Sequence, residues 1–258
     1  MEPIRMFGSD ALSVRIYASR IEMGAAAASD GAALLRSLLE KQEGVRVIFA
    51  AAPSQNEMLE SLCSADGIDW SRVTAFHMDE YIDLDAAAPQ GFGNFLRTRV
   101  FDRLPFSGVH YLNGNAPDVE VECNRYAALL EEAPIDLVFM GIGENGHIAF
   151  NDPPVADFHD PRTVKAVELD AVCRHQQVND GCFERLEQVP THALTLTVPA
   201  LAGARHHICV VPAITKASAV KATVEGPVAT SCPASILRTC TGAVLYLDSD
   251  SGSLLKEE

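Results

Sequence analysis

Short apolar segments rich in β-branched residues recur along the chain and alternate with longer amphipathic segments. Short apolar runs bounded by polar residues are typical of buried strands, and we predict strands at residues 45–51, 73–76, 135–140, 193–198, 208–211 and 243–247. Apolar residues at helical spacing predict helices at residues 31–41, 119–131 and 215–224. Strands that alternate with helices predict an α/β fold, Rossmann-like in character, with a mostly parallel sheet covered by helices on both faces.

The chain has 258 residues and shows no internal repeat, low-complexity tract or linker-like segment that would divide it. This length suits one α/β domain, so we expect a single domain over residues 1–258. Residues 151–162 are rich in Pro and Asp, and we expect them to form a loop or lid.

The formal net charge of −15 argues against a nucleic-acid partner, because a polyanion would be repelled. It leaves room for a small anionic substrate, since helix N-termini and a few local donors can hold a phosphate. No apolar stretch is long enough to span a bilayer, and the N-terminus lacks the pattern of a secretory signal. We therefore expect a cytoplasmic protein with no membrane partner.

The seven cysteines are scattered and form no C-x-x-C pair. We interpret them as free thiols in a reducing compartment. His206, His207 and Cys209 are close in sequence, but they fall in or beside a predicted strand, where neighbours point to opposite faces. We therefore expect no metal site.

Polar residues follow three of the predicted strands, at the sheet edge where α/β proteins bind ligands. After the first strand, Ser54 and Glu57 have the spacing of a capping box, which predicts a helix start. A helix N-terminus carries free N–H groups and partial positive charge, which suit a phosphate. The alternative is that Ser54 only caps the helix.

The second loop, residues 77–85, contains the adjacent carboxylates Asp79 and Glu80. A carboxylate whose pKa is raised by burial or by a like charge is a candidate general base. A solvated acidic turn is equally compatible with this segment. A loose divalent-ion site is a third interpretation, although the spacing does not match a calcium loop.

The third loop follows residues 135–140, and its Gly141, Gly143 and Gly146 satisfy the G-x-G-x-x-G pattern. That pattern indicates a dinucleotide site only when a helix follows, and the sequence NDPP at residues 151–154 breaks any helix. We therefore expect the glycines to let the backbone approach a small ligand. His147, with Asp152 five residues later, is then a candidate acid–base group.

The segments FHMDEYIDL (residues 76–84) and GIGENGHIAFNDP (residues 141–153) resemble motifs of the glucosamine-6-phosphate deaminase/isomerase family, which is related to the 6-phosphogluconolactonases. Lys216 also stands where this family has its phosphate-binding lysine. The resemblance covers nearly the whole chain. It implies a modified Rossmann-like fold and conversion of glucosamine 6-phosphate and water to fructose 6-phosphate and ammonia, without a cofactor.

The same resemblance assigns roles to individual residues. Asp79, next to Glu80, would transfer a proton between C2 and C1 of the open-chain sugar. His147 would assist ring opening, with Asp152 and Asn145 beside it. The substrate and its phosphate would contact Ser54, Gln55, Asn56, Gly143 and Lys216.

The sequence departs from the family pattern at three places. Asn145 replaces an aspartate that partners the histidine, and the phosphate loop has the sequence APSQN instead of a glycine-rich one. Gln177 aligns with a phosphate-binding arginine, for which Arg174 could substitute. A galactosamine 6-phosphate isomerase, a lactonase that uses His147 to activate water, and a catalytically silent sugar-phosphate-binding protein therefore stay open, as does assembly into a homo-oligomer.

Overall fold

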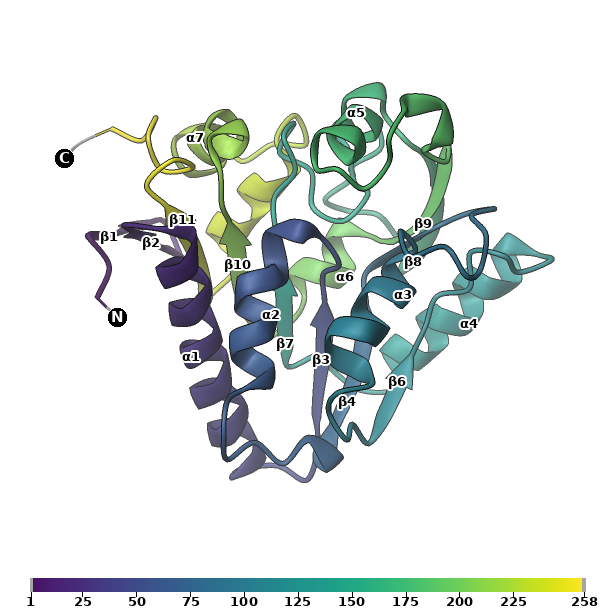
Figure 1. Ribbon diagram of the computed structural model, residues 1–258, viewed down its shortest axis with the longest axis horizontal. Helices are drawn as coiled ribbons and strands as arrows, with labels where there is room; N and C mark the ends of the chain where they lie inside the picture. The colour runs from purple at the N-terminus through teal and green to yellow at the C-terminus, as the bar shows by residue number, and fades with distance from the viewer. Residues whose placement is uncertain (1, 257–258) are drawn as a thin grey trace.

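The computed structural model describes residues 2–256, and its centre is an eight-stranded sheet within those residues (Figure 1). All neighbouring strands are parallel except the first pair, which is antiparallel. In spatial order the strands are β1 (Arg5–Ser9), β2 (Leu12–Tyr17), β11 (Ala243–Asp248), β10 (His206–Val211), β7 (Leu137–Met140), β3 (Val45–Phe49), β4 (Val73–His77) and β6 (Gly108–His110).

A smaller antiparallel sheet lies next to the carboxyl end of β4. Its order is β5 (Asp79–Tyr81), β9 (His192–Leu196) and β8 (Val164–Glu168). Only Met78 separates β4 from β5, so the chain passes directly from the main sheet into the small one. In the small sheet Asp79 pairs with Thr195.

Helices cover both faces of the main sheet (Figure 1). Because side chains alternate along a strand, Val47 and Phe49 pack on one face and Ile48 on the other. The first face is covered by α1 (Arg20–Leu39) and α2 (Asn56–Cys63), and the second by α4 (Val119–Glu131), α6 (Val198–Ala202) and α7 (Ala217–Glu225). The remaining helices are α3 (Phe92–Leu96), which continues as a π-helix over Arg97–Phe101, and α5 (Ala171–Asn179).

The predicted α/β class is confirmed, and each of the six predicted strands overlaps an observed one. The helix predicted at residues 119–131 has those bounds in the structure. However, α1 begins eleven residues earlier than the prediction of residue 31, at a cap where Ser19 accepts from the Glu22 N–H. The strand near residue 193 belongs to the small antiparallel sheet, not to the parallel one.

Two further findings concern the predicted loop and the absence of membrane-spanning segments. Residues 151–162 form turns without a regular helix, which confirms a loop, but they do not line the pocket described below. No helix within residues 2–256 is long and apolar enough to cross a membrane.

Candidate active site

The strand order reverses between β3 and β7, which are neighbours in the sheet although β4 and β6 lie between them in the sequence. In open α/β sheets such a switch point forms a crevice beyond the carboxyl ends of the strands. The loops after β3, β4, β7 and β10 all reach this crevice. They enclose what we call the main pocket.

The main pocket also receives side chains from β5 and α5. Its lining consists of Ala50, Ala51, Ala52, Ser54, Gln55, Met78, Asp79, Phe92, Gly141, Ile142, Gly143, His147, Ala149, Phe150, Gln176, Gln177 and Lys216. The sequence predicted seven of these as site residues. They are Ser54, Gln55, Asp79, Gly143, His147, Gln177 and Lys216.

The loop after β3 forms a single 3₁₀ turn over Pro53–Gln55 before α2 begins at Asn56. The predicted capping box is absent, because Ser54 caps neither helix and Glu57 pairs with Arg20 at 2.7 Å. Ser54 therefore faces the pocket, where its Oγ accepts from the Gln55 amide at 3.1 Å. The same amide donates to the Val210 carbonyl at 3.1 Å.

Two buried polar atoms in the main pocket lack a hydrogen-bond partner within residues 2–256. They are the Gln55 Oε1 and the Lys216 Nζ. Burial lowers the pKa of Lys216, while the negative charges of Asp180 and Glu144 oppose this effect. Because buried polar groups are almost always paired, an unpaired acceptor and an unpaired ammonium in one pocket indicate a site for a polar, anionic ligand.

Asp79 is 8% exposed and lies on β5, with its side chain in the main pocket. Burial and the neighbouring charge of Glu80 raise its pKa well above the ordinary value of 3.8. A carboxyl group in this state is a stronger base once it is ionised, as carbon-acid chemistry requires.

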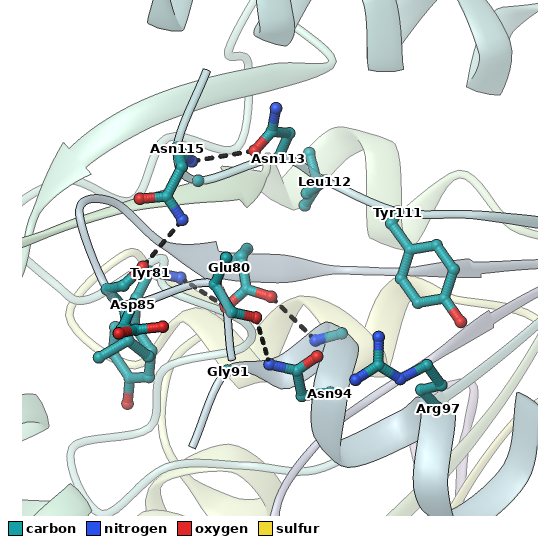
Figure 2. Close-up of a pocket in the computed structure, with 14 residues that line it drawn as sticks. Glu80, Tyr81, Asp85, Gly91, Asn94, Arg97, Tyr111, Leu112, Asn113 and Asn115 are labelled. Atoms are coloured by element: carbon teal, nitrogen blue, oxygen red, sulfur yellow. Dashed lines mark hydrogen bonds between the residues drawn. The ribbon is translucent and has the colours of Figure 1, made fainter. Parts of the chain in front are cut away.

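Glu80 points to the opposite side of β5, into a separate cavity lined by residues such as Asn94, Arg97, Asn113 and Asn115 (Figure 2). Its carboxylate accepts from the N–H groups of Tyr81, Phe92 and Gly93 at 2.9–3.0 Å. Glu80, which the sequence predicted as a site residue beside Asp79, therefore lies outside the main pocket. It holds the start of α3 and acts on Asp79 only through its charge.

His77 is fully buried behind Asp79. Its Nε2 accepts from the Leu112 N–H at 3.0 Å, so its Nδ1 carries the proton and donates to the Asp79 carbonyl at 2.9 Å. Burial lowers the pKa of His77 to about 4, which keeps the ring neutral near pH 7. The ring thus fixes the backbone that carries the candidate base.

His147 lies at the other side of the main pocket, in a network with Asn145 and Asp152. Its Nδ1 is 2.8 Å from the Asn145 Oδ1 and 3.0 Å from the Asp152 Oδ1. The Asn145 Nδ2 donates to that same Asp152 oxygen at 2.8 Å. Since both neighbours of Nδ1 are acceptors, Nδ1 carries a proton, and Nε2 is the acceptor of the neutral ring.

Asp152 gives this network a negative charge at the centre. Burial alone would raise its pKa, but hydrogen bonds and charge from His147, with help from Asn145, lower it below the ordinary value. The replacement of a family aspartate by Asn145 therefore does not remove charge support from His147. Asp152 supplies that support directly.

Gly143 is required by the ring of His147. A Cβ at this position would lie 2.1–2.3 Å from atoms of the imidazole, closer than any real contact. The glycine therefore makes room for His147 to pack flat against the loop. This role was not among those expected for Gly143.

Helix α5 closes one side of the main pocket with Gln176 and Gln177. Gln177 is where the sequence predicted it, whereas Gln176, whose Oε1 accepts from the Glu144 N–H at 2.8 Å, was missed. Arg174 does not replace the family arginine, because its guanidinium donates to the carbonyls of Leu186 and Val189 and lines a different cavity.

Asn56 also lies outside the main pocket. Its Oδ1 accepts from the Arg99 Nε at 3.0 Å, and Arg99 lines a second cavity that shares Ala51, Gln176 and Gln177 with the main pocket. Asn56 thus positions a cation near the site. No sequence motif pointed to Arg99, which belongs to the π-helical segment.

The remaining sequence predictions concern cysteines and cofactors. All seven cysteines are free, as expected. No helix follows Gly146, so the context required for a dinucleotide site is lacking. The His207 Nε2 donates to the Leu201 carbonyl at 2.9 Å, and no metal-ligand group within residues 2–256 includes His207 with Cys209. In the described part of the chain the one such group is His147, Asp152 and Cys173.

Known proteins share both the sequence and the architecture. The family model for glucosamine-6-phosphate isomerases/6-phosphogluconolactonase matches residues 18–246. Glucosamine-6-phosphate deaminase of Listeria welshimeri is 36% identical over 211 residues, which are 82% of this chain and 88% of that protein. The enzyme of the same name from an Exiguobacterium species is 39% identical over 74% of each chain.

Among solved structures, a monomeric glucosamine-6-phosphate deaminase superposes with a TM-score of 0.85 and 25% identity, over 93% of this chain and 99% of that one. The 6-phosphogluconolactonase of Thermotoga maritima superposes with a TM-score of 0.76 at 17% identity, over 92% and 99% of the two chains, which shows a shared fold. The family match spans most of the chain and includes every loop of the main pocket. The chain therefore belongs to the glucosamine-6-phosphate isomerase/6-phosphogluconolactonase family.

Proposed function

We propose that this protein is a glucosamine-6-phosphate deaminase that acts as one domain and converts an amino-sugar 6-phosphate and water to a ketose 6-phosphate and ammonia. The observation that carries the proposal is that Asp79, His147 and Lys216, from three loops distant in sequence, line one pocket. Deaminases that are 36–39% identical over most of the chain support the same reaction.

The phosphate binds at the Lys216 side of the main pocket. Lys216 offers a buried ammonium without a partner in the described chain, and the Ser54 hydroxyl lies in the same pocket. A phosphate dianion there would pair the ammonium and raise its pKa. This local attraction overcomes the repulsion expected from a protein of net charge −15 because it acts at short range in a buried site.

His147 opens the sugar ring. Its Nε2 accepts the proton of the anomeric hydroxyl and returns a proton to the ring oxygen, which breaks the hemiacetal and yields the aldehyde. Asn145 and Asp152 hold the Nδ1 proton throughout and stabilise the imidazolium that forms transiently.

Asp79 then moves a proton along the open chain. It removes the proton from C2 and delivers it to C1, while a proton passes from the C2 amine to the C1 oxygen, so that the aldose becomes a C2 imine with a C1 hydroxymethyl group. Water adds to the imine carbon, and ammonia leaves as the C2 ketone forms. These steps need a positioned base and a fixed substrate and no redox partner.

The need for the Asp79 carboxylate distinguishes this reaction from lactone hydrolysis. Hydrolysis of a lactone needs a base that activates water, a task for which His147 is sufficient, and Asp79 would be dispensable. Removal of the proton at C2 of a sugar depends on Asp79. Which epimer is the substrate depends on contacts to a single hydroxyl group.

The test measures ammonia release and ketose phosphate formation from purified protein with glucosamine 6-phosphate, galactosamine 6-phosphate and 6-phosphogluconolactone. We expect turnover of one hexosamine phosphate, and loss of at least about 10³-fold in kcat for Asp79→Asn. Lactone hydrolysis that survives this variant would instead establish a lactonase. Thermal stabilisation by a hexosamine phosphate without any turnover would establish a binding protein.

A further inference from the structure

His147 and Asp152 form a cluster with a third side chain, Cys173 of α5. All three residues are buried, and their ligand atoms lie within 4.8 Å of one another. The three come from separate parts of the chain, the loop after β7, the segment that follows it, and α5. Cys173 has no part in the proposed reaction and does not line the main pocket.

Asp152 supplies the carboxylate of this cluster. The Asp152 Oδ1 contacts Asn145 and His147, whereas the buried Asp152 Oδ2 has no nitrogen or oxygen donor within hydrogen-bond distance in residues 2–256. Asp152 itself is 1% exposed. The Cys173 thiol lies within hydrogen-bonding reach of the Asp152 carboxylate, and this contact lowers the pKa of Asp152, while burial and the charge of Asp152 raise the pKa of Cys173. The carboxylate, the buried thiol and the imidazole therefore form a set of three metal-ligand donors at close range.

The chemistry of the donors selects the class of ion. A thiolate and an imidazole are preferred by zinc and similar transition metals, whereas magnesium and calcium prefer oxygen ligands alone. One carboxylate and one thiolate together balance the charge of a divalent ion, which a buried site requires. Three protein ligands leave a further position for water.

We propose that His147, Asp152 and Cys173 form an inhibitory binding site for Zn²⁺. The ion takes the place of the Nδ1 proton of His147, which moves through solvent to Nε2 of the same ring, and of the thiol proton of Cys173, which passes to solvent. The His147–Asp152 and His147–Asn145 hydrogen bonds are lost, and metal–ligand bonds replace them.

Metal binding at Nδ1 changes what His147 can do in the pocket. The remaining ring proton must then sit on Nε2, so the nitrogen that faces the substrate becomes a donor and can no longer accept the anomeric proton. Zn²⁺ therefore blocks ring opening without occupying the phosphate position. This consequence for turnover rests on the proposed function, whereas metal binding itself does not.

The binding test uses the intact protein and Co²⁺ or Zn²⁺ alone. Co²⁺ should give a thiolate-to-metal absorption band, and Zn²⁺ should abolish that band by competition. Cys173→Ser should remove the band and weaken Zn²⁺ binding by at least about 100-fold. The matched control is Cys182→Ser, because Cys182 is a partly exposed thiol just beyond α5 that lies outside the cluster. This control should bind both metals as the wild type does.

The activity test measures deamination with and without micromolar Zn²⁺. We expect inhibition that a chelator reverses, and resistance to Zn²⁺ in Cys173→Ser with its metal-free activity retained. The absence of a thiolate band in the wild-type protein, or equal Zn²⁺ affinity of both cysteine variants, would overturn the metal site. A protein that binds Zn²⁺ as described but deaminates no hexosamine phosphate would overturn the proposed function and leave the metal site standing.

Discussion

At the scale of single residues, the pocket combines groups that are costly to bury with groups that hold them in place. Asp79 carries a carboxyl group in an apolar surrounding, and His77 fixes its backbone from behind. Across the pocket, Asp152 and Asn145 hold His147 in one tautomer. The stability lost by burying Asp79 is characteristic of functional sites, where activity and stability oppose each other.

Replacement of Asp79 by asparagine should stabilise the protein relative to the wild type, and more so at high pH than at low pH. The pKa of Asp79 is higher in the folded than in the unfolded state, so its contribution to stability is present below pH 3.8 and is lost as the pH rises through the folded pKa. Asparagine has no such loss. We expect the melting temperature of Asp79→Asn minus that of the wild type to increase from pH 4 to pH 8.

At pH 8 the free energy of unfolding of Asp79→Asn should exceed that of the wild type by about 1–3 kcal/mol. Each kcal/mol should raise the melting temperature by roughly 2–4 °C. Thermal unfolding at several pH values measures it. A difference between the two melting temperatures that does not change with pH would show that Asp79 is not buried as the structure places it.

Asn145→Asp should impair the protein, although it restores the residue typical of the family. The amide of Asn145 donates to Asp152 at 2.8 Å, and an aspartate there would set two buried carboxylates against each other. Such a pair shares a proton and has one strongly raised pKa. We therefore expect the free energy of unfolding to fall by about 1–3 kcal/mol at pH 7. The loss should diminish at lower pH, because protonation of one carboxylate removes the repulsion.

Urea unfolding at pH 7 and pH 5 measures this loss, and the exposed Asn115→Asp variant controls for the added charge. A rise in kcat/KM without loss of stability would contradict the assignment of Asp152 as the charged partner of His147.

At the scale of elements, β5 places two adjacent carboxylates on opposite sides. Because side chains alternate along a strand, Asp79 faces the main pocket and Glu80 faces the cavity of Figure 2. Glu80 accepts three backbone N–H groups, two of them from the first turn of α3. The strand thus separates a pair of like charges into a candidate base, Asp79, and a structural group, Glu80.

Glu80→Gln should change both the stability and the pH profile. The amide group of glutamine would meet the Gly93 N–H donor, so we expect a loss of about 1–3 kcal/mol. The charge of Glu80 raises the pKa of Asp79, so its removal should move the acid limb of kcat/KM to lower pH. The pH dependence of kcat/KM measures this shift. An acid limb that stays in place or moves to higher pH would show that Asp79 is not the group that titrates.

The sequence revealed most of the parallel sheet because buried strands such as β3 and β7 are continuous apolar runs. It failed to reveal β1, β2 and β8, in which apolar and polar residues are mixed, and β5 and β6, which have only three residues each. Pairing of β5 with β9 joins segments more than a hundred residues apart, and local pattern cannot predict it.

The candidate site was predictable to the extent that its residues follow strands. Asp79, His147 and Lys216 do so, and they meet in one pocket. The roles of Glu80, Asn56 and Arg174 could not be predicted, because each depends on a hydrogen-bond partner elsewhere in the fold.

At the scale of the whole molecule, the first and the last strand of the chain differ in their importance for the main sheet. β1 is an edge strand that pairs only with β2 and has exposed residues such as Met6. β11 lies between β2 and β10, and its Leu245 and Leu247 are fully buried. The sheet can therefore lose β1 but not β11.

Two deletions test this difference. Removal of residues 2–9 should leave a folded, active protein with a lower melting temperature, because only one edge strand is lost. Removal of residues from 243 onward should give a protein without cooperative unfolding, because β2 and β10 lose their common neighbour. Circular dichroism during thermal unfolding distinguishes the two. A cooperatively folded protein after the second deletion would contradict the strand order.

The position of β11 also has a consequence for how the protein is made. β2 leaves the ribosome early, but its parallel neighbour β11 follows only after residues 18–242 have been synthesised. At 5–20 residues per second, this delay is on the order of tens of seconds. Throughout that time one edge of β2 has no native neighbour and is open to pairing with other nascent chains. The hairpin of β1 and β2 therefore joins the main sheet only after synthesis ends. The yield of folded protein then depends on what shields the open edge of β2 until β11 pairs with it.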